Sequence, residues 1–440
     1  MAGIFKAYDI RGIFGDTLTP DIATDIGRAF VDFLGCRKVV IGRDMRSHSP
    51  AMFEALARGV TMQGADVIDV GICSTPMCYY ANGSLGADGS IMITASHNPG
   101  EWNGMKMCRE QAIPISGPTG IEAIEQLVNG RQLKPAAARV GTVSHHDIVP
   151  AYVQHIRGFA EIKRPLRIAV DYANAMGIVE AQALEGLYAS RALFDTLDGT
   201  FPNHEANPLD HETLEPLQHL ISHEGPFDFG IAFDGDADRV GFVDERGDIV
   251  PMDLITALIA QTMLKKQAGR IFYDLRSSKA VPEAITESGG TPMMSRVGHA
   301  FIKRQMRDAD ALFAGELSGH YYFRENYFTE SSALAVIYVA NLVSAAQLPL
   351  SALIAPLRRY SPSGEINSKV GDVDAVFARL RAAYPDARFT ELDGLTVEYD
   401  HWWFNVRASN TEPLVRLNLE APTADAMAKR RDEVLALIRA

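Results

Sequence analysis

Cysteine and excess positive charge are both scarce in this chain, and each shortage excludes a class of protein. The 440 residues include 4 cysteines, none of them in a C-x-x-C spacing. We therefore expect reduced thiols rather than a disulfide framework. Lysine and arginine number 42 against 55 aspartates and glutamates, which gives a formal net charge of −13. This balance argues against binding to nucleic acid, whose phosphates need a concentrated basic face.

Long hydrophobic runs are also missing. The most apolar window, residues 333–355, is interrupted by Asn341, Ser344, Gln347 and Pro349. This window predicts a buried helix followed by a turn rather than a membrane span. The first residues of the chain lack the apolar core of a signal peptide. We therefore expect a soluble, cytoplasmic protein that does not contact a membrane.

Two motifs of common enzymes are absent as well. The chain has no G-x-x-x-x-G-K-[ST] phosphate loop, so a nucleotide phosphoryl donor is not indicated. It also has no G-x-S-x-G motif, which carries the nucleophile of many serine hydrolases.

What the chain does contain is a recurring order of strands and helices. Thr19 and Pro20 start a predicted helix that ends near Gly35, and Ser49 with Pro50 caps the next helix. Strands that alternate with helices in this way predict an α/β layer with a mostly parallel sheet. Near the C-terminus, residues 415–420 alternate strictly between apolar and polar side chains, which predicts a half-exposed antiparallel sheet. We predict three similar α/β domains and a C-terminal α+β domain, at residues 1–150, 151–250, 251–360 and 361–440.

Each predicted α/β domain ends one strand in a polar loop. The first loop follows the apolar run Ile91–Ile93 and presents Ser96 beside His97. Asn98 and Pro99 then mark a turn, because proline pushes the preceding residue out of the helical region. A serine at the mouth of a strand is both rigid and exposed, as a reactive hydroxyl needs to be. An ordinary loop whose hydroxyl caps backbone amides has the same pattern.

The second loop carries Asp234, Asp236 and Asp238 at alternate positions. Carboxylates this close repel one another unless a cation lies between them, and an all-oxygen ligand set favours Mg²⁺. A calcium loop is an alternative because Glu245 occupies its twelfth position, although Arg239 stands where that loop needs glycine. A phosphatase-like D-x-D loop with Asp234 as nucleophile and a solvated acidic turn are further alternatives.

Two other loops suit a phosphorylated sugar. Glu316, Ser318 and His320 alternate between two glycines and offer the donors and acceptors that a polyol needs, although a surface turn would look similar. Residues 407–413 with Arg416 combine two arginines, two hydroxyls and an amide, which is the composition of a phosphate cradle. A cluster of solvated residues is the alternative. Together with the serine and the aspartates, these loops predict phosphoryl transfer on a sugar.

These motifs resemble those of the α-D-phosphohexomutase superfamily, and most closely its bacterial phosphomannomutase/phosphoglucomutase branch. Five motifs occur in the family's order over nearly the whole chain: FKAYDIRG at 5–12, TASHNP at 94–99, DGDADR at 234–239, GELSGH at 315–320 and RASNTEP at 407–413. The resemblance implies three α/β domains with mixed sheets and a C-terminal α+β domain, arranged around a central cleft.

The resemblance also implies roles for individual residues. Ser96 would carry a phosphoryl group and, with Asp234, Asp236 and Asp238, bind Mg²⁺. The other implied catalytic residues are His97, Lys106, His299, Arg11 and Arg239. The implied substrate-binding residues are Tyr8, Arg276, Glu316, Ser318, His320, Arg407, Ser409, Asn410, Thr411 and Arg416. Arg276 stands where many members of the family carry lysine.

The implied reaction interconverts hexose 6-phosphate and hexose 1-phosphate. Phosphoserine would transfer its phosphoryl group to the sugar. The resulting hexose 1,6-bisphosphate would then reorient in the cleft and rephosphorylate Ser96. Lys106, His299 and Arg11 all stay candidates for moving the hydroxyl proton, and a preference for mannose or glucose is not indicated. A glucosamine-phosphate mutase is an alternative, although Leu317 replaces the glutamine typical of those enzymes. A non-catalytic sugar-phosphate-binding protein is another, and either a monomer or a small homo-oligomer fits.

Overall fold

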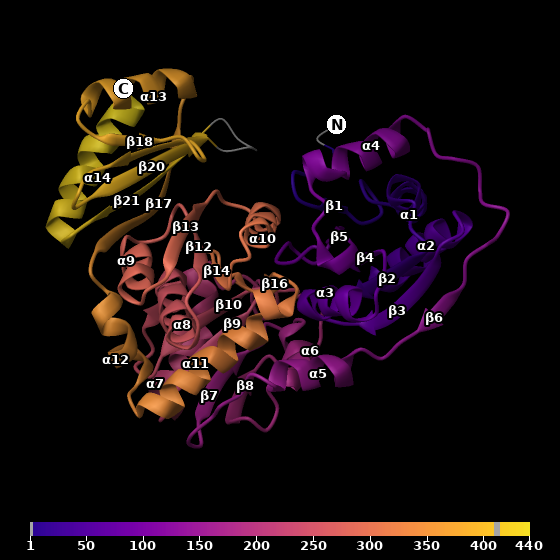
Figure 1. Cartoon of the computed structure of the whole chain (residues 1–440), viewed down its shortest axis with the longest axis horizontal. Helices are drawn as coiled ribbons and strands as arrows, with labels where there is room; N and C mark the ends of the chain where they lie inside the picture. The colour runs from indigo at the N-terminus through magenta and orange to yellow at the C-terminus, as the bar shows by residue number, and fades with distance from the viewer. Residues whose placement is uncertain (1–2, 409–413) are drawn as a thin grey trace.

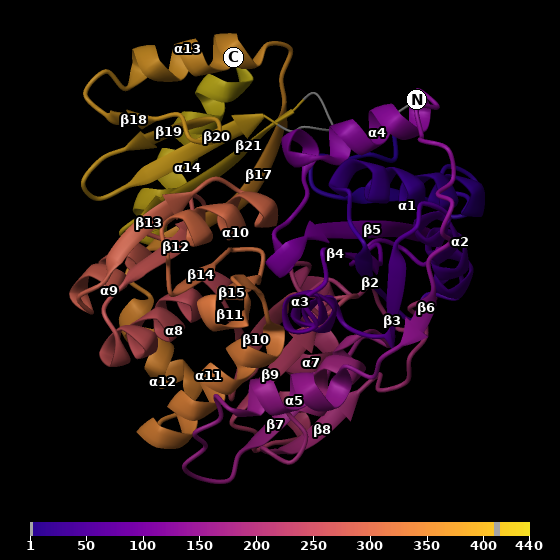
Figure 2. The same ribbon diagram turned by 45° about the vertical axis from the view of Figure 1, so that its right-hand side comes forward.

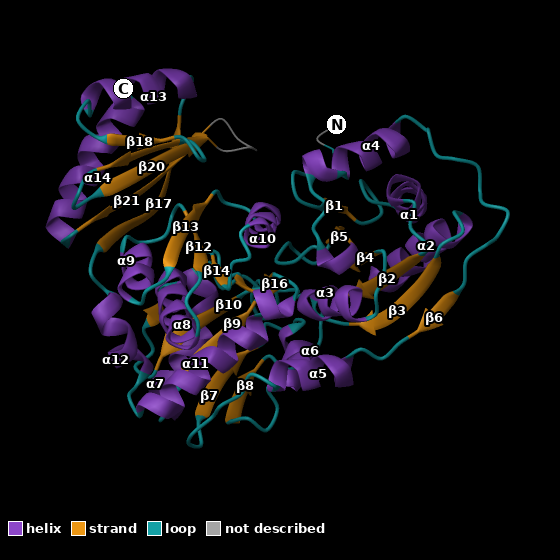
Figure 3. Ribbon diagram, in the orientation of Figure 1, coloured by secondary structure: helices purple, strands orange, loops and turns teal. Residues whose placement is uncertain are grey.

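The computed structural model of the chain describes residues 3–408 and 414–440. Within this part of the chain the strands form four sheets, and helices lie against each of them (Figure 3). The N-terminal sheet and the C-terminal sheet lie at opposite sides of the molecule in Figure 1, and the turned view shows the C-terminal sheet beside the third one (Figure 2).

The first sheet has six strands in the order β1-β5-β4-β2-β3-β6. The helix predicted between Thr19 and Gly35 is confirmed, with the Thr19 side chain accepting from the backbone N–H of Ile22 and Gly35 in the left-handed region. Ser49 is not the cap of the next helix as predicted, because it lies inside that helix and donates to Asp44 at 2.6 Å. The elements are β1 (Ile10–Ile13), α1 (Pro20–Leu34), β2 (Lys38–Arg43), α2 (Ser49–Met62), β3 (Asp66–Ile72), α3 (Thr75–Ser84), β4 (Gly89–Ile93), β5 (Trp102–Arg109), α4 (Ile121–Asn129) and β6 (Val143–His145).

The second and third sheets have five strands each, in the orders β11-β10-β9-β7-β8 and β13-β12-β14-β15-β16. The second comprises α5 (Val149–Arg157), β7 (Arg167–Asp171), α6 (Gly177–Glu180), β8 (Ala189–Leu193), α7 (Glu215–Glu224), β9 (Phe229–Phe233), β10 (Val240–Asp244) and β11 (Ile249–Val250). The third comprises α8 (Met252–Lys266), β12 (Arg270–Asp274), α9 (Ala280–Glu287), β13 (Thr291–Ser295), α10 (His299–Asp308), β14 (Phe313–Gly315), β15 (Tyr321–Phe323), β16 (Thr329–Glu330), α11 (Ser332–Ala346) and α12 (Leu350–Ile354).

The repeat predicted from the sequence is confirmed by the strand pairing. In each of the three sheets a central strand has parallel neighbours on both sides, and one neighbour then begins an antiparallel hairpin. The sheets are therefore mixed. Three of five strand pairings are parallel in the first sheet, and two of four are parallel in the second and in the third. The three polar loops each connect the strands of that hairpin, β4 to β5, β9 to β10 and β14 to β15. Equivalent positions in three sheets thus present the serine, the aspartates and the predicted sugar loop.

The fourth sheet, in the order β17-β21-β20-β19-β18, is antiparallel throughout, as its alternating pattern predicts. The elements of this fourth part are β17 (Ser361–Lys369), α13 (Val373–Ala383), β18 (Arg388–Thr390), β19 (Leu395–Glu398), β20 (Trp403–Ala408), β21 (Leu414–Ala421) and α14 (Ala424–Arg439). The domain boundaries at residues 150, 250 and 360 stay predictions.

The hydrophobic core also sets the fourth sheet apart. One continuous cluster joins buried side chains of the first three sheets, among them Met92, Phe233 and Phe313, whereas the fourth sheet packs its own cluster around Phe404 and Leu417. All four cysteines are free and buried. Within the described residues no single helix is long and apolar enough to cross a membrane, although Ser332–Ala346 and Leu350–Leu357 reach that length and hydropathy together across a bend of 98°.

Candidate active site

The serine loop is held in a tight conformation at the end of β4. Ser96 is buried and its φ of 51° lies in the left-handed region, which costs energy for a residue other than glycine. Its backbone N–H donates to Thr94 Oγ1 at 3.0 Å. Its hydroxyl donates to Asp234 Oδ2 at 3.0 Å and lies 3.2 Å from His97 Nδ1. The first two polar loops are therefore in direct contact through this hydroxyl.

A buried arginine that the sequence reasoning missed fixes the backbone of this loop. Arg46 is 1% exposed and pairs with Asp44 at 3.2 Å. Its guanidinium donates to the carbonyl oxygens of Ser96, Asn98, Pro99 and Trp102. Because one side chain binds four carbonyl oxygens, it fixes the conformation of the serine loop. Two charged residues directly after a buried strand were the available signal in the sequence.

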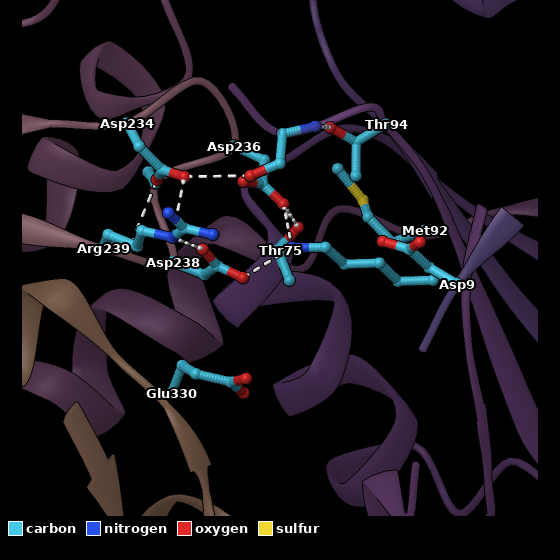
Figure 4. Close-up of polar contacts among 12 residues, drawn as sticks. Asp9, Thr75, Met92, Thr94, Asp234, Asp236, Asp238, Arg239 and Glu330 are labelled. Atoms are coloured by element: carbon cyan, nitrogen blue, oxygen red, sulfur yellow. Dashed lines mark hydrogen bonds and ion pairs between the residues drawn. The ribbon is translucent and has the colours of Figure 1, made fainter. Parts of the chain in front are cut away.

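The aspartates of the second loop gather as predicted, and all three are buried (Figure 4). One carboxylate oxygen from each of Asp234, Asp236 and Asp238 lies within 4.8 Å of the others. Burial, together with the charges of Asp236 and Asp238, raises the pKa of Asp234 well above its usual range. Asp236 Oδ1 and Asp238 Oδ1 are buried and lack a hydrogen-bond partner among the described residues. Buried carboxylate oxygens that gather around one point without a hydrogen-bond donor suit a metal ion.

The calcium-loop alternative needs Glu245 as a ligand of the same ion. Glu245 instead accepts hydrogen bonds from the backbone N–H and the hydroxyl of Ser351. The flanking elements are strands β9 and β10 and not helices. The structure therefore contradicts the calcium loop.

Two side chains of the first domain reach across to the aspartates. Lys106 Nζ donates to Asp236 Oδ2 at 2.6 Å and to Asp238 Oδ2 at 2.5 Å, and Thr75 Oγ1 donates to Asp236 Oδ2 at 2.6 Å. Burial alone lowers the pKa of Lys106, but Asp236 and Asp238 outweigh it and hold that pKa above its ordinary value. Thr75, at the start of α3, was not predicted from the sequence because its partner is 161 residues away.

Three loops thus meet at one junction. Arg239, which follows the aspartates, has its Nε 3.2 Å from His320 Nε2 and 3.7 Å from Asp234 Oδ2. His320 Nε2 lies 3.4 Å from Asp238 Oδ1, and its Nδ1 lies 2.8 Å from Ser318 Oγ. Burial lowers the pKa of His320, but Asp238 outweighs it and raises the value to about 9. The predicted sugar loop therefore packs directly on the predicted metal loop.

The other members of the sugar loop are held from within the third sheet. Glu316 is buried and accepts from the backbone N–H of Gly298 at 3.1 Å and from the hydroxyl of Tyr322. Arg276 follows β12 and pairs with Asp274 at 2.6 Å. Contact of Glu316, Ser318 and Arg276 with a sugar stays a prediction.

The two candidate histidines are both largely buried. Burial, then the positive charges of Arg239, Arg11 and Lys106, lower the pKa of His97 to about 2. Burial likewise places the pKa of His299 well below its ordinary value. His299 is therefore uncharged, and an uncharged imidazole can accept a proton.

Beneath His299 lies a pair that the sequence reasoning did not identify. The buried Glu330 pairs with the fully buried Lys303 at 2.9 Å, and its other oxygen lies 3.6 Å from His299 Nδ1. Lys303 also stacks over the ring of Tyr79 from the first domain, with Nζ 4.2 Å from the ring centroid. A basic helix residue 27 positions away from its acid gave no sequence signal.

The N-terminal candidates connect the first and third domains. Arg11 pairs with Asp9 at 2.9 Å and donates to Asn98 in the serine loop. The Tyr8 hydroxyl donates to the carbonyl oxygen of Val297 at 3.4 Å, and its ring packs edge-on against His299. Both predicted residues therefore lie beside the loops that carry Ser96 and His299.

The described part of the predicted phosphate cradle lies on the fourth sheet. Arg407 on β20 and Arg416 on β21 are paired neighbours across the two strands. Glu365 on β17 binds both guanidinium groups. The remaining predicted members, Ser409, Asn410 and Thr411, lie outside the described residues.

Four models of one protein family match successive parts of the chain. Models of the phosphoglucomutase/phosphomannomutase family match residues 2–134 (alpha/beta/alpha domain I), 150–247 (domain II), 251–360 (domain III) and 365–437 (C-terminal domain). A phosphomannomutase of Escherichia coli is 40% identical, and the match covers 99% of each chain. A protein named phosphohexose mutases from Xanthomonas campestris pv. campestris is 39% identical, again over 99% of each chain.

A solved structure agrees with these sequence matches. The crystal structure of a phosphoglucomutase/phosphomannomutase family protein from Burkholderia thailandensis superposes with a TM-score of 0.91 and 33% identity, covering 99% of this chain and 96% of that one. Four domain models in the family's order, full-length relatives and this superposition lead to one conclusion. The chain belongs to the phosphoglucomutase/phosphomannomutase family.

Proposed function

We propose that this protein is a phosphohexomutase that interconverts hexose 6-phosphate and hexose 1-phosphate through a phosphoserine at Ser96. Full-length similarity to proteins named phosphomannomutase and phosphohexose mutase supports this class of reaction. The observation that carries the catalytic proposal is the contact of the Ser96 hydroxyl with Asp234, at 3.0 Å, at the edge of a buried three-carboxylate cluster. A nucleophile beside a metal site is the arrangement that phosphoryl transfer needs.

The ion that fits this cluster is Mg²⁺. The donor set is all oxygen, it is buried, and two of its oxygens lack a partner among the described residues. Asp234, Asp236 and Asp238 would hold the ion together with the oxygen of Ser96. When bound, Mg²⁺ would neutralise the charge that develops on the transferring phosphoryl group.

The chain's own residues perform the rest of the chemistry. In the forward half-reaction, the bond between the Ser96 oxygen and phosphorus breaks while a sugar hydroxyl oxygen forms a bond to the same phosphorus. Lys106 and Arg239 lie beside the clustered aspartates, where their positive charges can stabilise the phosphoryl oxygens. We propose His299 rather than Lys106 as the group that accepts the hydroxyl proton, because two carboxylates hold Lys106 in its charged form, which has no free electron pair.

The second half-reaction reverses the roles of the two phosphates. Hexose 1,6-bisphosphate reorients in the site, presents its other phosphoryl group and transfers it to Ser96. Arg407 and Arg416 bind the phosphate that is not being transferred, with Ser409, Asn410 and Thr411 proposed to complete that cradle. Glu316 and Ser318 are proposed to bind sugar hydroxyls, with His320 and Tyr8 at the margins of the same site.

Replacing the phosphorylated serine tests this proposal. Ser96→Ala should abolish conversion of mannose 1-phosphate and glucose 1-phosphate while the thermal unfolding midpoint stays unchanged. Ser222→Ala, at an exposed serine of α7, is the matched control and should keep full activity. Substantial turnover by Ser96→Ala would reject the phosphoserine. Ranking mannose, glucose and glucosamine phosphates by kcat/KM then decides which hexose the enzyme prefers.

Metal dependence is a separate test. Enzyme stripped with a chelator should lose activity, and Mg²⁺ should restore it. Activity that persists after the metal is removed would reject the ion's role at Asp234, Asp236 and Asp238.

A further inference from the structure

The phosphate cradle of the fourth sheet already contains an anion, and it belongs to the chain itself. Glu365 Oε2 accepts from Arg407 Nη2 at 2.5 Å, and Glu365 Oε1 accepts from Arg416 Nη1 at 3.1 Å. Each carboxylate oxygen therefore binds one guanidinium, which is also how a phosphate bridges two arginines. The sequence analysis did not identify Glu365.

The strand pairing explains why an anion stabilises this position. Arg407 and Arg416 are opposite each other on neighbouring antiparallel strands, where like charges repel. Glu365 is paired with Asn418, two residues from Arg416, so it lies on the same face of the sheet. Its carboxylate thus relieves a repulsion that the cradle would otherwise carry when no ligand is bound.

The backbone of β17 is shaped to deliver this side chain. The register between β17 and β21 shifts between Pro362 and Glu365, which marks a bulge, and Gly364 within it has φ of 69°. Bulges re-aim the side chains that follow them, and this one ends at the residue that reaches both arginines. Burial raises the pKa of Glu365, but Arg407, Arg416 and the more distant Arg276 outweigh it and lower the pKa below its ordinary value. The group is therefore ionised.

We propose that Glu365 competes with the substrate for the phosphate cradle: its carboxylate occupies Arg407 and Arg416 while the cradle is empty and is exchanged for the non-transferred phosphate of the bound hexose phosphate. This inference rests on the proposed function of the cradle. A phosphate that took the same N–H groups would lie within a few Å of the carboxylate, and two anions at that separation repel. Binding of phosphate is therefore an exchange of one anion for another.

The exchange suits a reaction whose bisphosphate intermediate must reorient in the site. The phosphate bound by the two arginines has to leave in each cycle, so that the other phosphate of the bisphosphate can take its place. When the phosphate leaves, Glu365 returns to the guanidiniums, and the two like charges do not face each other alone. The carboxylate thus weakens the binding of the resting phosphate and eases its departure.

The experiment compares Glu365→Gln with the wild-type enzyme. Glutamine keeps the size of the side chain and removes the charge. Glu391→Gln is the matched control, because Glu391 also pairs with an arginine of the fourth domain, Arg381, but lies outside the cradle. Titration calorimetry with glucose 6-phosphate should give a dissociation constant about fivefold to tenfold lower for Glu365→Gln and an unchanged one for Glu391→Gln.

Turnover provides a second readout that distinguishes competition from simple support of the arginines. Competition predicts that Glu365→Gln lowers KM and kcat together. The substrate is bound more tightly, and the bisphosphate intermediate reorients more slowly. If Glu365 only positions the arginines, the variant binds glucose 6-phosphate more weakly and its KM rises. Weaker binding or unchanged binding would each overturn the proposal.

Two further measurements keep the test decisive. In the Glu365→Gln/Arg407→Ala double variant the gain in affinity should disappear, and a gain that persists would place it outside the cradle and overturn the proposal. If Glu365→Gln does not fold, Glu365→Asp serves instead, since its shorter carboxylate cannot span both guanidiniums. That variant should bind glucose 6-phosphate more tightly, and weaker or equal binding overturns the proposal. The calorimetry needs no turnover, so a failure of the mutase function would be seen separately, as inactive wild-type enzyme that still binds glucose 6-phosphate.

Discussion

A single methyl group at Gly235 should disrupt catalysis without removing any reactive group. Gly235 separates two of the clustered aspartates and lies against the serine loop. A Cβ at this position would lie 2.1 Å from the carbonyl oxygen of Ser96 and 2.9 Å from its carbonyl carbon. Both are backbone atoms, so no flexible side chain can move aside. The serine loop and the metal loop must then separate by more than about 1 Å to reach ordinary van der Waals contact.

The serine loop has little freedom to make this movement. The carbonyl oxygen that the new methyl group would meet accepts from Arg46 at 3.0 Å, and Arg46 also binds three further carbonyls of the loop. Overpacking of this kind costs about 1–3 kcal/mol of stability. A misplacement of about 1 Å between reacting groups can lower the rate about 100-fold. We therefore expect kcat/KM of Gly235→Ala to fall by about that factor.

Steady-state kinetics with glucose 1-phosphate and Mg²⁺ measures this effect, and thermal unfolding shows that the variant is folded at the assay temperature. Gly371→Ala is the control, because a Cβ at Gly371 meets nothing within 4 Å. It should keep wild-type kinetics. If Gly235→Ala also keeps wild-type kinetics, the close contact between the two loops does not set the catalytic geometry, and the reasoning is refuted.

Three other changes test separate parts of the structure. Glu330→Gln should lower the free energy of unfolding by about 3–5 kcal/mol, because it leaves the buried Lys303 charged and without a counter-ion; a denaturant-measured loss under about 1 kcal/mol would contradict this. Glu180 is buried at the end of α6, and burial raises its pKa to about 7. Between pH 4.5 and 7 the folded state therefore binds more protons than the unfolded state, and stability falls as pH rises through that window by up to about 1.4 kcal/mol per unit. Glu180→Gln should flatten that slope, and an identical slope in both proteins would show that another group causes it. Arg407→Ala should raise KM for hexose phosphates about tenfold with a smaller effect on kcat, and an unchanged KM would remove Arg407 from the phosphate site.

Local sequence patterns predicted those features of the site that depend on neighbouring residues. Buried strands that end in polar loops indicated Ser96, Asp234 and His320, and the strand pairing places their loops at equivalent positions in three sheets. Alternate spacing of the aspartates correctly predicted that their carboxylates converge. Strict alternation likewise predicted the antiparallel fourth sheet. Alternating strands and helices predicted the parallel pairings of the three sheets but not their antiparallel hairpins, because the pattern does not show where a hairpin reverses the chain.

Residues whose partners are remote in sequence could not be predicted in this way. Thr75 meets Asp236 and Glu365 meets Arg407 only because the tertiary fold joins segments far apart in sequence. Lys303 had the pattern of an ordinary charged helix residue, although it is fully buried. Each is a polar group whose partner is remote in sequence, and only the tertiary fold specifies such pairs.

The central claim, that Ser96 carries the transferred phosphoryl group, can be measured directly. Mass spectrometry of the peptide that contains Ser96 should be done before and after incubation of the folded enzyme with glucose 1,6-bisphosphate and Mg²⁺. A phosphoryl group on Ser96 is the predicted result, and Ser96→Ala treated in the same way should give an unmodified peptide. An unmodified Ser96 under both conditions would contradict the covalent mechanism and favour a protein that binds sugar phosphates without turning them over.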